Sequence, residues 1–226
     1  MFPLVHSKCL NWSPSRPDFC VEKRTIEERT ACGSSPLHFA ILNQNLDLVR
    51  AILQARPETV RAINNKGETP LHWACTQTDN PLLPKLLLLH GADVNQADEV
   101  GNTPLHWAAQ ADNITVLPYL ISAGADVNEI NEEYLTPIDL AVIHGAQAVV
   151  EFLLPISEDM DDLLYLSCEH GEAGIAELLV NSGLYSVKSL DHPDSPLHVA
   201  IAKQHADCVR VLMSFCYDPK RRASVL

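Results

Sequence analysis

The sequence predicts an all-α solenoid, in which about six pairs of helices stack on one another. The first observation is a motif, Ser/Thr-Pro-Leu-His, whose copies at Ser35, Thr69 and Thr103 begin 34 residues apart. A degenerate copy begins at Thr136 and a further full copy at Ser195. The second is that Ser or Thr caps a helix, while proline fits its first position. The third is that each repeat contains two short apolar helix faces, which only stacked neighbours can bury.

The third repeat shows how each helix follows from local chemistry. Asp98–Asn102 has the composition of a tight turn, and Thr103 then caps a first helix over Leu105–Ala111. A polar Asp-Asn pair interrupts this helix. Apolar residues recur on one face of a second helix over Ile114–Ala123, which Gly124 ends.

Five further segments follow the same frame, and two of them, the fourth and fifth repeats, depart from it. The fifth repeat lacks the Thr-Pro motif but keeps both apolar helix faces. The fourth has Tyr134 at the turn position of a glycine, and the acidic loop Ser157–Asp162 replaces the full turn that should follow it. These changes predict a structural discontinuity between repeats four and five. The five predicted helix pairs lie within Ser35–Ile63, Thr69–Ala97, Thr136–Ile156, Leu163–Gly183 and Ser195–Cys216.

The chain resembles the ankyrin-repeat family. The resemblance rests on the Thr-Pro-Leu-His motif, its period, and two Gly-Ala-Asp-Val-Asn endings at residues 91–95 and 124–128. It implies an all-α ankyrin solenoid of helix-turn-helix units with short β-turn or hairpin fingers, with one unit truncated. We expect an N-terminal arm or partial cap over 1–29, the repeat domain over 30–218, and a short basic tail over 219–226. The predicted repeats span about 30–63, 64–97, 98–130, 131–156, 157–189 and 190–218.

Charge and composition exclude several classes of function. The chain has 29 acidic against 16 basic residues and a formal net charge of -13. Because an acidic surface repels phosphate backbones, we expect no binding to nucleic acid, and a partner protein with a basic or amphipathic segment instead. No segment is apolar enough to span a membrane. We also expect the chain to be a monomer. Cysteines without a pairing pattern favour a reducing compartment, the cytoplasm, with the nucleus as the alternative.

The histidines and cysteines raise the question of catalysis or metal binding. Zinc-type spacings and nucleophile motifs are absent from the sequence. His6 with Cys9 or Cys20 is the remaining thiol–imidazole combination, but a proline-rich segment offers it no rigid scaffold. We therefore expect no enzymatic activity, no cofactor and no metal. Three other cysteines fall on apolar rows of the repeats, where a thiol packs as a small hydrophobic group: Cys75, Cys168 and Cys208.

Four histidines occupy the last position of the repeated motif: His38, His72, His106 and His198. In the family that this chain resembles, the equivalent imidazole hydrogen-bonds backbone and hydroxyl groups around the turns. The resemblance implies the same structural role here. Successive copies would lie too far apart to share a metal ion, whose bonds are about 2 Å long.

Two surfaces are candidates for binding a partner protein. The aromatic series Phe39, Trp73 and Trp107 either packs along the first helices or supplies anchor side chains, since Trp is enriched at binding hot spots. In ankyrin proteins, finger tips and exposed positions of the first helices commonly contact partners. The predicted protein-binding residues are Lys66, Glu68, Trp73, Gln77, Glu99, Asn102, Trp107, Gln110, Glu132, Tyr134 and His144.

Short patterns indicate candidate modification sites. Asn95 and Asn128 each close an Ala-Asp-Val-Asn turn, eight residues after a leucine, which resembles the pattern modified by the asparaginyl hydroxylase of ankyrin repeats. The structural alternative is that each side chain bonds its own turn. Ser224 follows Arg221 and Arg222 in a pattern that resembles a basophilic kinase site, and the last residues resemble a PDZ-type ligand.

The sequence therefore favours a non-enzymatic protein-binding module: an adaptor, scaffold or inhibitor that binds through its fingers and concave first helices. One alternative is a substrate-recognition subunit of a separately encoded enzyme complex. Another is an ankyrin-type microbial effector that acts on host proteins in the host cytosol. The sequence does not name the partner.

Overall fold

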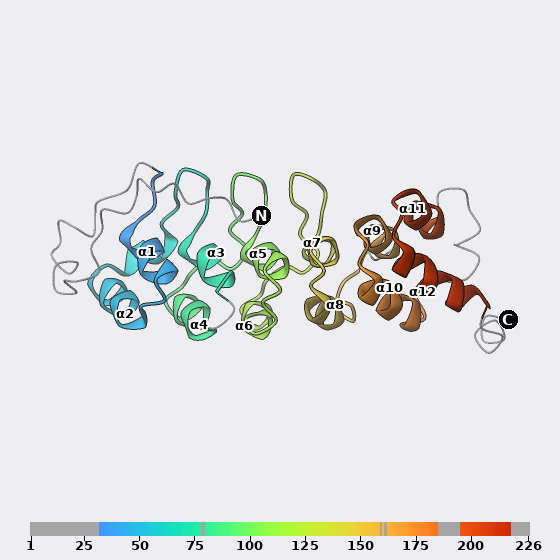
Figure 1. Cartoon of the computed structure of the whole chain (residues 1–226). Coiled ribbons are helices and arrows are strands. Elements are labelled where there is room, and N and C mark those ends of the chain that lie inside the picture. Colours follow the sequence, from blue (N-terminus) through green and yellow to red (C-terminus); the bar gives the residue numbers. More distant parts are fainter. Residues whose placement is uncertain (1–31, 78–79, 159, 161, 185–194, 218–226) are drawn as a thin grey trace. The chain divides into compact units, whose positions relative to one another are not determined.

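The computed structural model describes residues 32–77, 80–158, 160, 162–184 and 195–217. Within these ranges the chain forms helices and turns without any strand, and the helices come in consecutive pairs (Figure 1). The all-α class and the paired helices are confirmed. The expected arm over 1–29 and tail over 219–226 lie outside the described residues, as do His6, Cys9, Cys20 and Ser224.

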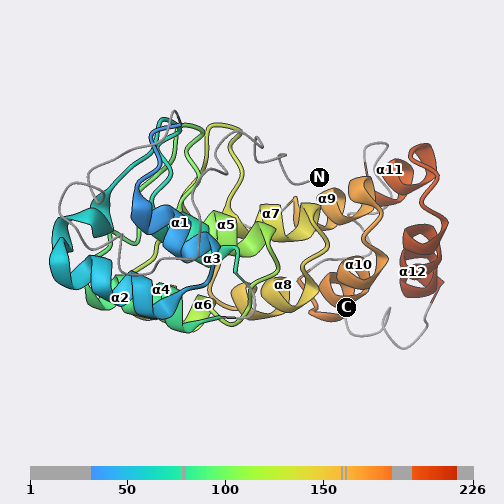
Figure 2. The same cartoon turned by 60° about the vertical axis from the view of Figure 1, so that its left-hand side comes forward.

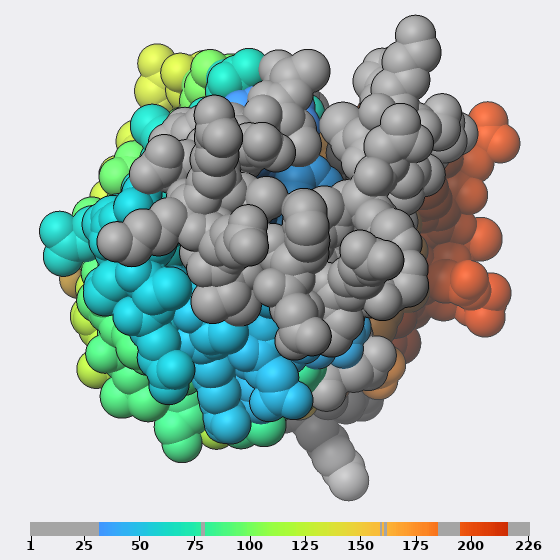
Figure 3. Space-filling view, turned by 90° about the vertical axis from the view of Figure 1, so that its left-hand side faces the viewer, coloured from blue at the N-terminus to red at the C-terminus, as the bar shows by residue number. Residues whose placement is uncertain are grey.

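The chain divides into two compact units. The N-terminal unit comprises Met1–Ala108 and Thr115–Ala125, and the C-terminal unit comprises Ala109–Ile114 and Asp126–Leu226. The boundary therefore passes through the third repeat. In Figure 3, which faces the first repeat, the blue and cyan surface belongs to that repeat.

The N-terminal unit arranges its helices in two rows, with the first helix of each repeat in one row and the second in the other (Figure 2). Helix α1 packs on both α2 and α3, and α3 packs on α4. Loops between the repeats project beyond the row of first helices and form the fingers (Figure 2). The helices are α1 (Pro36–Leu42), α2 (Leu46–Ala55), the 3-10 helix η2 (Pro57–Arg61), α3 (Pro70–Cys75), α4 (Leu82–Leu89), α5 (Pro104–Gln110), whose last two residues belong to the C-terminal unit, and α6 (Leu117–Ser122).

The C-terminal unit repeats the same plan with three further pairs. First helices pack on first helices, as α7 does on α9 and α9 on α11, and second helices pack on second helices, as α8 does on α10 and α10 on α12. The fourth repeat keeps both helices, so its truncation is confined to its ending. The helices are α7 (Pro137–Ile143), α8 (Gln147–Leu153), α9 (Leu163–His170), α10 (Ala173–Asn181), α11 (Pro196–Ala202) and α12 (Ala206–Tyr217).

The second helix of the third repeat begins later than predicted, at Leu117 instead of Ile114. The reason is Pro118, which occupies the first turn of α6. Had the helix begun at Ile114, Pro118 would have lain in its interior, where the missing N–H breaks the hydrogen-bond ladder. A turn over residues 114–116 precedes the helix instead.

The predicted discontinuity between repeats four and five does not coincide with the division between the two compact units, and a bend at this junction stays a prediction. Both repeats belong to the C-terminal unit, and the division between the units passes through the third repeat. The shortened junction is hydrogen-bonded: the Ser157 N–H donates to the Leu153 carbonyl (3.0 Å), and the Glu158 N–H donates to Asn128 Oδ1 (3.0 Å). The acidic loop thus replaces the missing turn with bonds of its own.

Candidate protein-binding surface

The second, third and fourth fingers are each organised by an acidic or amide side chain at the first position. In the second finger, Asn64 Oδ1 accepts the N–H groups of Lys66 (2.9 Å) and Glu68 (3.0 Å). Asp98 Oδ1 accepts the equivalent pair in the third finger, from Val100 (3.0 Å) and Asn102 (2.8 Å). In the fourth, Asn131 Oδ1 accepts from residues 133 and 135, each at 2.9 Å. The finger backbones are therefore fixed before any partner binds.

Neighbouring fingers of the N-terminal unit are joined by backbone hydrogen bonds. The Asn65 N–H donates to the Cys32 carbonyl (3.0 Å), and the Glu99 N–H donates to the Lys66 carbonyl (2.9 Å). This close approach requires glycine: a Cβ on Gly67, at φ +73°, would lie 2.9 Å from the Glu99 nitrogen. The exposed side chains of Lys66 and Glu99 thus stand on a rigid backbone.

The motif histidines join each repeat to the finger that follows. His72 Nδ1 accepts the Thr69 N–H (3.0 Å) and hydroxyl (2.9 Å), and its Nε2–H donates to the Asn102 carbonyl (2.9 Å). Because a backbone N–H can only donate, Nδ1 is unprotonated and the ring is neutral. His38 makes the same set with Ser35 and Glu68. The structural role implied by the resemblance is observed, and Asn102 takes part in it through its carbonyl.

The N-terminal unit is expected to lose stability as the pH falls below 6.5, the ordinary pKa of histidine. Burial lowers the pKa of His72, opposed in part by the Asn102 bond and by Asp98 and Glu68. Since the folded pKa lies below the unfolded one, the unfolded chain binds more protons between the two values. The contribution is full above pH 6.5 and is lost as the pH falls towards the folded pKa.

The limit for one such group is about 1.4 kcal/mol per pH unit. Urea titrations on either side of pH 6.5 measure the effect. His72→Gln, which donates and accepts but does not titrate, should give a shallower pH dependence than the wild type. An unchanged slope in this variant would contradict the assignment to His72.

Both tryptophans of the predicted site are half-buried in the N-terminal unit. The Trp73 ring meets His38 edge to face (5.2 Å between centroids), and the Trp107 ring meets His72 likewise (5.4 Å). Their indole N–H groups donate to finger carboxylates, Trp73 to Glu68 (2.8 Å) and Trp107 to Asp98 (2.9 Å). Packing along the first helices therefore accounts for the position of both rings. The Glu68 carboxylate accepts a hydrogen bond from the Trp73 indole.

Tyr134 is the most exposed aromatic side chain among the described residues outside the helix interiors. Its ring is 82% exposed, and its φ of +61° places it in the left-handed region. The equivalent positions in the second and third fingers are Gly67 and Gly101, at φ +73° and +78°. An L-residue in this region is strained by about 1–2 kcal/mol. Packing within the chain does not account for a tyrosine here, because the ring projects into solvent.

The remaining predicted residues lie on exposed edges of the first helices. In the N-terminal unit, Gln77 Oε1 accepts from Gln44 Nε2 (3.1 Å), a residue that the sequence analysis did not select. In the C-terminal unit, Gln110 Nε2 lies 3.2 Å from His144 Nε2. Glu132 is exposed on the fourth finger. The structure therefore brings two predicted edge residues together, Gln110 and His144, and places Gln77 against a residue that was not predicted.

Comparison with known families agrees with this geometry. A profile for three consecutive ankyrin repeats matches residues 17–98 and 77–163, and a single-repeat profile matches residues 194–222. The chain belongs to the ankyrin-repeat family. Ankyrin repeats are generally protein–protein interaction modules, typically without catalytic activity. The fifth repeat lies between the matched ranges, and α9 and α10 supply its helix pair.

Two solved ankyrin structures are similar to this chain. One is the ankyrin-repeat domain of Bcl-3, described as a unique member of the IkappaB protein family, with 27% identity, a TM-score of 0.68, and coverage of 82% of this chain and 88% of that chain. The other is the human ASB11 ankyrin-repeat domain, with 27% identity, a TM-score of 0.71, and coverage of 83% and 86%. No curated protein sequence matches this chain.

The two candidate hydroxylation sites link successive ankyrin repeats. Asn95 Nδ2 donates to the Gly124 carbonyl (2.9 Å), and Asn128 Oδ1 accepts the Glu158 N–H (3.0 Å). The structural alternative was that each asparagine side chain bonds its own turn. In these turns it is the carboxylates of Asp93 and Asp126 that accept the backbone N–H groups of Asn95 and Asn128. Hydroxylation of Asn95 and Asn128 stays a prediction.

The cysteines in the repeats are buried as predicted. Cys75, Cys168 and Cys208 are all fully buried, and burial raises the pKa of each thiol, for Cys168 to about 12. These thiols are therefore protonated and unreactive at neutral pH. In the described part of the chain, His, Cys, Asp and Glu side chains form no group of three that could hold a metal ion. None of the described helices is long and apolar enough to cross a membrane.

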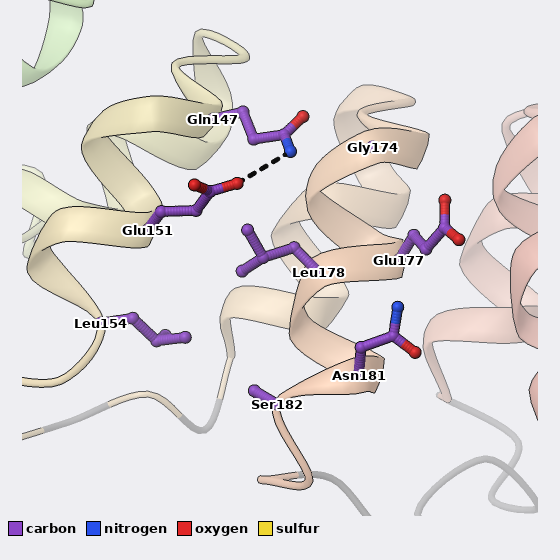
Figure 4. Close-up of a pocket in the computed structure, with 8 residues that line it drawn as sticks. All are labelled: Gln147, Glu151, Leu154, Gly174, Glu177, Leu178, Asn181 and Ser182. Atoms are coloured by element: carbon purple, nitrogen blue, oxygen red, sulfur yellow. Dashed lines mark hydrogen bonds between the residues drawn. The ribbon is translucent and has the colours of Figure 1, made fainter.

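A shallow groove of about 600 Å³ separates α8 from α10 in the C-terminal unit (Figure 4). Leu154 and Leu178 point into it, and Gln147 donates to Glu151 at its rim (3.0 Å). Histidine and cysteine are absent from its lining. The groove includes none of the predicted binding residues.

Proposed function

We propose that this chain is a non-enzymatic protein-binding module, an adaptor, scaffold or inhibitor of the cytoplasm, that binds a partner through its fingers and first-helix edges. The observation that supports it best is Tyr134. Its ring is exposed and its backbone occupies a conformation that glycine adopts in the preceding fingers. Strained backbone positions cluster at functional sites, and aromatic side chains are enriched at binding hot spots.

The fingers also indicate the chemistry of the partner. Glu99 and Val100 are exposed on the third finger, and Glu132, Glu133 and Tyr134 are exposed on the fourth. Carboxylates beside apolar tips fit a basic or amphipathic segment, in which cations speed the encounter and apolar groups provide affinity. The fixed finger backbones leave little conformational entropy to be lost on binding.

The test is capture of partners from the native cell by the tagged full chain, identified by mass spectrometry, followed by affinity measurements on variants. Tyr134→Ala and Glu99→Lys should each weaken binding by about 1 kcal/mol or more without lowering the melting temperature. Leu89→Ala and Glu177→Lys make comparable changes on exposed positions of the second helices, in α4 and α10. These controls should bind normally.

Normal binding by both finger variants, with loss of binding on changes in repeats five and six, would contradict the assigned surface. A captured ligase, kinase or transferase that modifies a second bound protein would instead favour the alternative function, a substrate-recognition subunit. If the captured partners come from a host cell, the microbial effector is favoured.

A further inference from the structure

The sixth repeat exposes a surface that every earlier repeat buries. Six residues after the capping position of each first helix, every repeat has one small or apolar residue. In the sixth repeat this residue is Ile201, which is 57% exposed. The equivalent residues of repeats one to five are fully buried: Ile41, Cys75, Ala109, Val142 and Cys168.

Neighbouring positions on α11 and α12 show the same difference. Leu197 and Val209 are half-buried, and Met213 is 38% exposed. At the position of Leu197 the earlier repeats have buried Leu37, Leu71, Leu105, Ile138 and Leu164. At the position of Val209 they have buried Val49, Pro84, Leu117, Val150 and Ala176. The residues Leu197, Ile201, Val209 and Met213 are called the end face below.

Within one repeat stack, this surface is the part of a helix pair that the next pair covers. In the C-terminal unit, α9 and α10 are covered in this way by α11 and α12 (Figure 2). Each repeat of a solenoid contacts its neighbours, and these contacts bury such apolar faces. An apolar end face therefore requires a cover whose shape resembles another helix pair.

We propose that the end face binds the same face of a second copy of this chain, so that two chains pair through α11 and α12 about a two-fold axis. The interface continues the packing between repeats, and a two-fold axis lets one self-complementary surface serve both chains. This inference departs from the monomer expected from the sequence, and it is independent of the partner-binding surface on the fingers.

The distribution of charge favours this end of the chain for self-association. The chain has a formal net charge of -13, which opposes the approach of two copies. Over residues 195–217 the charged residues are Lys203, Asp207 and Arg210, which leave one net positive charge. Lys203 is paired with Glu169 (3.1 Å), and Arg210 is paired with Asp207. Two copies can therefore meet here without the repulsion that the acidic surface causes elsewhere.

The tail after Tyr217 has an unsuitable composition for covering the end face. It begins Asp-Pro-Lys-Arg-Arg, and only its last residues are apolar. A segment with proline near its start and three consecutive basic residues offers little apolar surface to α11 and α12.

Sedimentation equilibrium of the full chain over two orders of magnitude in concentration tests the proposal. The wild type should shift from monomer to dimer, and added salt should strengthen the association because it screens repulsion between the acidic chains. Ile201→Glu and Met213→Glu should each weaken it about tenfold or more. Leu89→Glu makes the same kind of change at an exposed leucine of α4 and should leave association unchanged. Circular dichroism and thermal unfolding show that each variant is folded.

Three outcomes would overturn the proposal. The first is a wild type that stays monomeric at every concentration. If this wild type dimerises only after truncation at Tyr217, the tail occupies the end face. The second is growth into open-ended oligomers, which would show that the end face binds a different surface of the next copy. The third is unchanged association of a folded Ile201→Glu variant.

Discussion

Replacing His72 with alanine is expected to lower the free energy of unfolding of the N-terminal unit by about 3–5 kcal/mol. The imidazole is fully buried and makes three hydrogen bonds, two with Thr69 and one with the carbonyl of Asn102. Alanine leaves the Thr69 N–H and the Asn102 carbonyl without this partner, and it leaves a cavity where the ring stood. The change also releases the third finger from the second repeat, so local and tertiary contacts are lost together.

Urea unfolding followed by circular dichroism measures this effect, because the helix signal reports the unfolding of both units. His198→Ala is the matched control: it occupies the same motif position in the sixth repeat, where the side chain is exposed. Its Nδ1 bonds the Ser195 hydroxyl (2.9 Å), as in the other repeats. We expect a loss under about 1 kcal/mol for this variant. Equal losses in the two variants would show that the bond to the next finger contributes nothing.

Much of the fold could be predicted because the signals are local. A Thr or Ser cap, a proline at the first helical position and a regular apolar face each act over a few residues, and the repeat multiplies them. Where one local signal was overlooked, the prediction failed: Pro118 moves the start of α6 to Leu117. The division between the units could not be predicted, because it depends on contacts summed over whole repeats.

The candidate site was predicted less completely, since its geometry depends on side chains that meet across repeats. Gln44 was missed although it bonds Gln77, because the two residues lie 33 positions apart. Asn64, Asp98 and Asn131 were missed as organisers of the fingers, although their near-constant spacing was a usable signal. The indole bonds of Trp73 and Trp107 had no signal in the sequence, because they depend on where each finger folds back.

Gly67→Ala should destabilise the N-terminal unit by about 2–4 kcal/mol, the second large effect that the structure implies. Part of this comes from a positive φ of +73°, which alanine adopts only with strain. The rest comes from the neighbouring finger, since the new Cβ would lie 2.9 Å from the Glu99 nitrogen and 3.1 Å from the Asp98 carbonyl carbon. These are backbone atoms, so the third finger must shift and the bond from the Glu99 N–H to the Lys66 carbonyl must lengthen.

Gly124→Ala separates the two contributions. Gly124 has a similar φ of +89°, but a Cβ there would meet no atom within 4 Å. Its loss should therefore be the conformational part alone, about 1–2 kcal/mol. The difference between the two variants in urea unfolding measures what contact between fingers adds, and equal losses would show that the fingers move apart freely. Tyr134 also indicates that conformational strain and contact with the next finger are separate effects. It has a positive φ in the fourth finger, where the acidic loop replaces the finger that would follow.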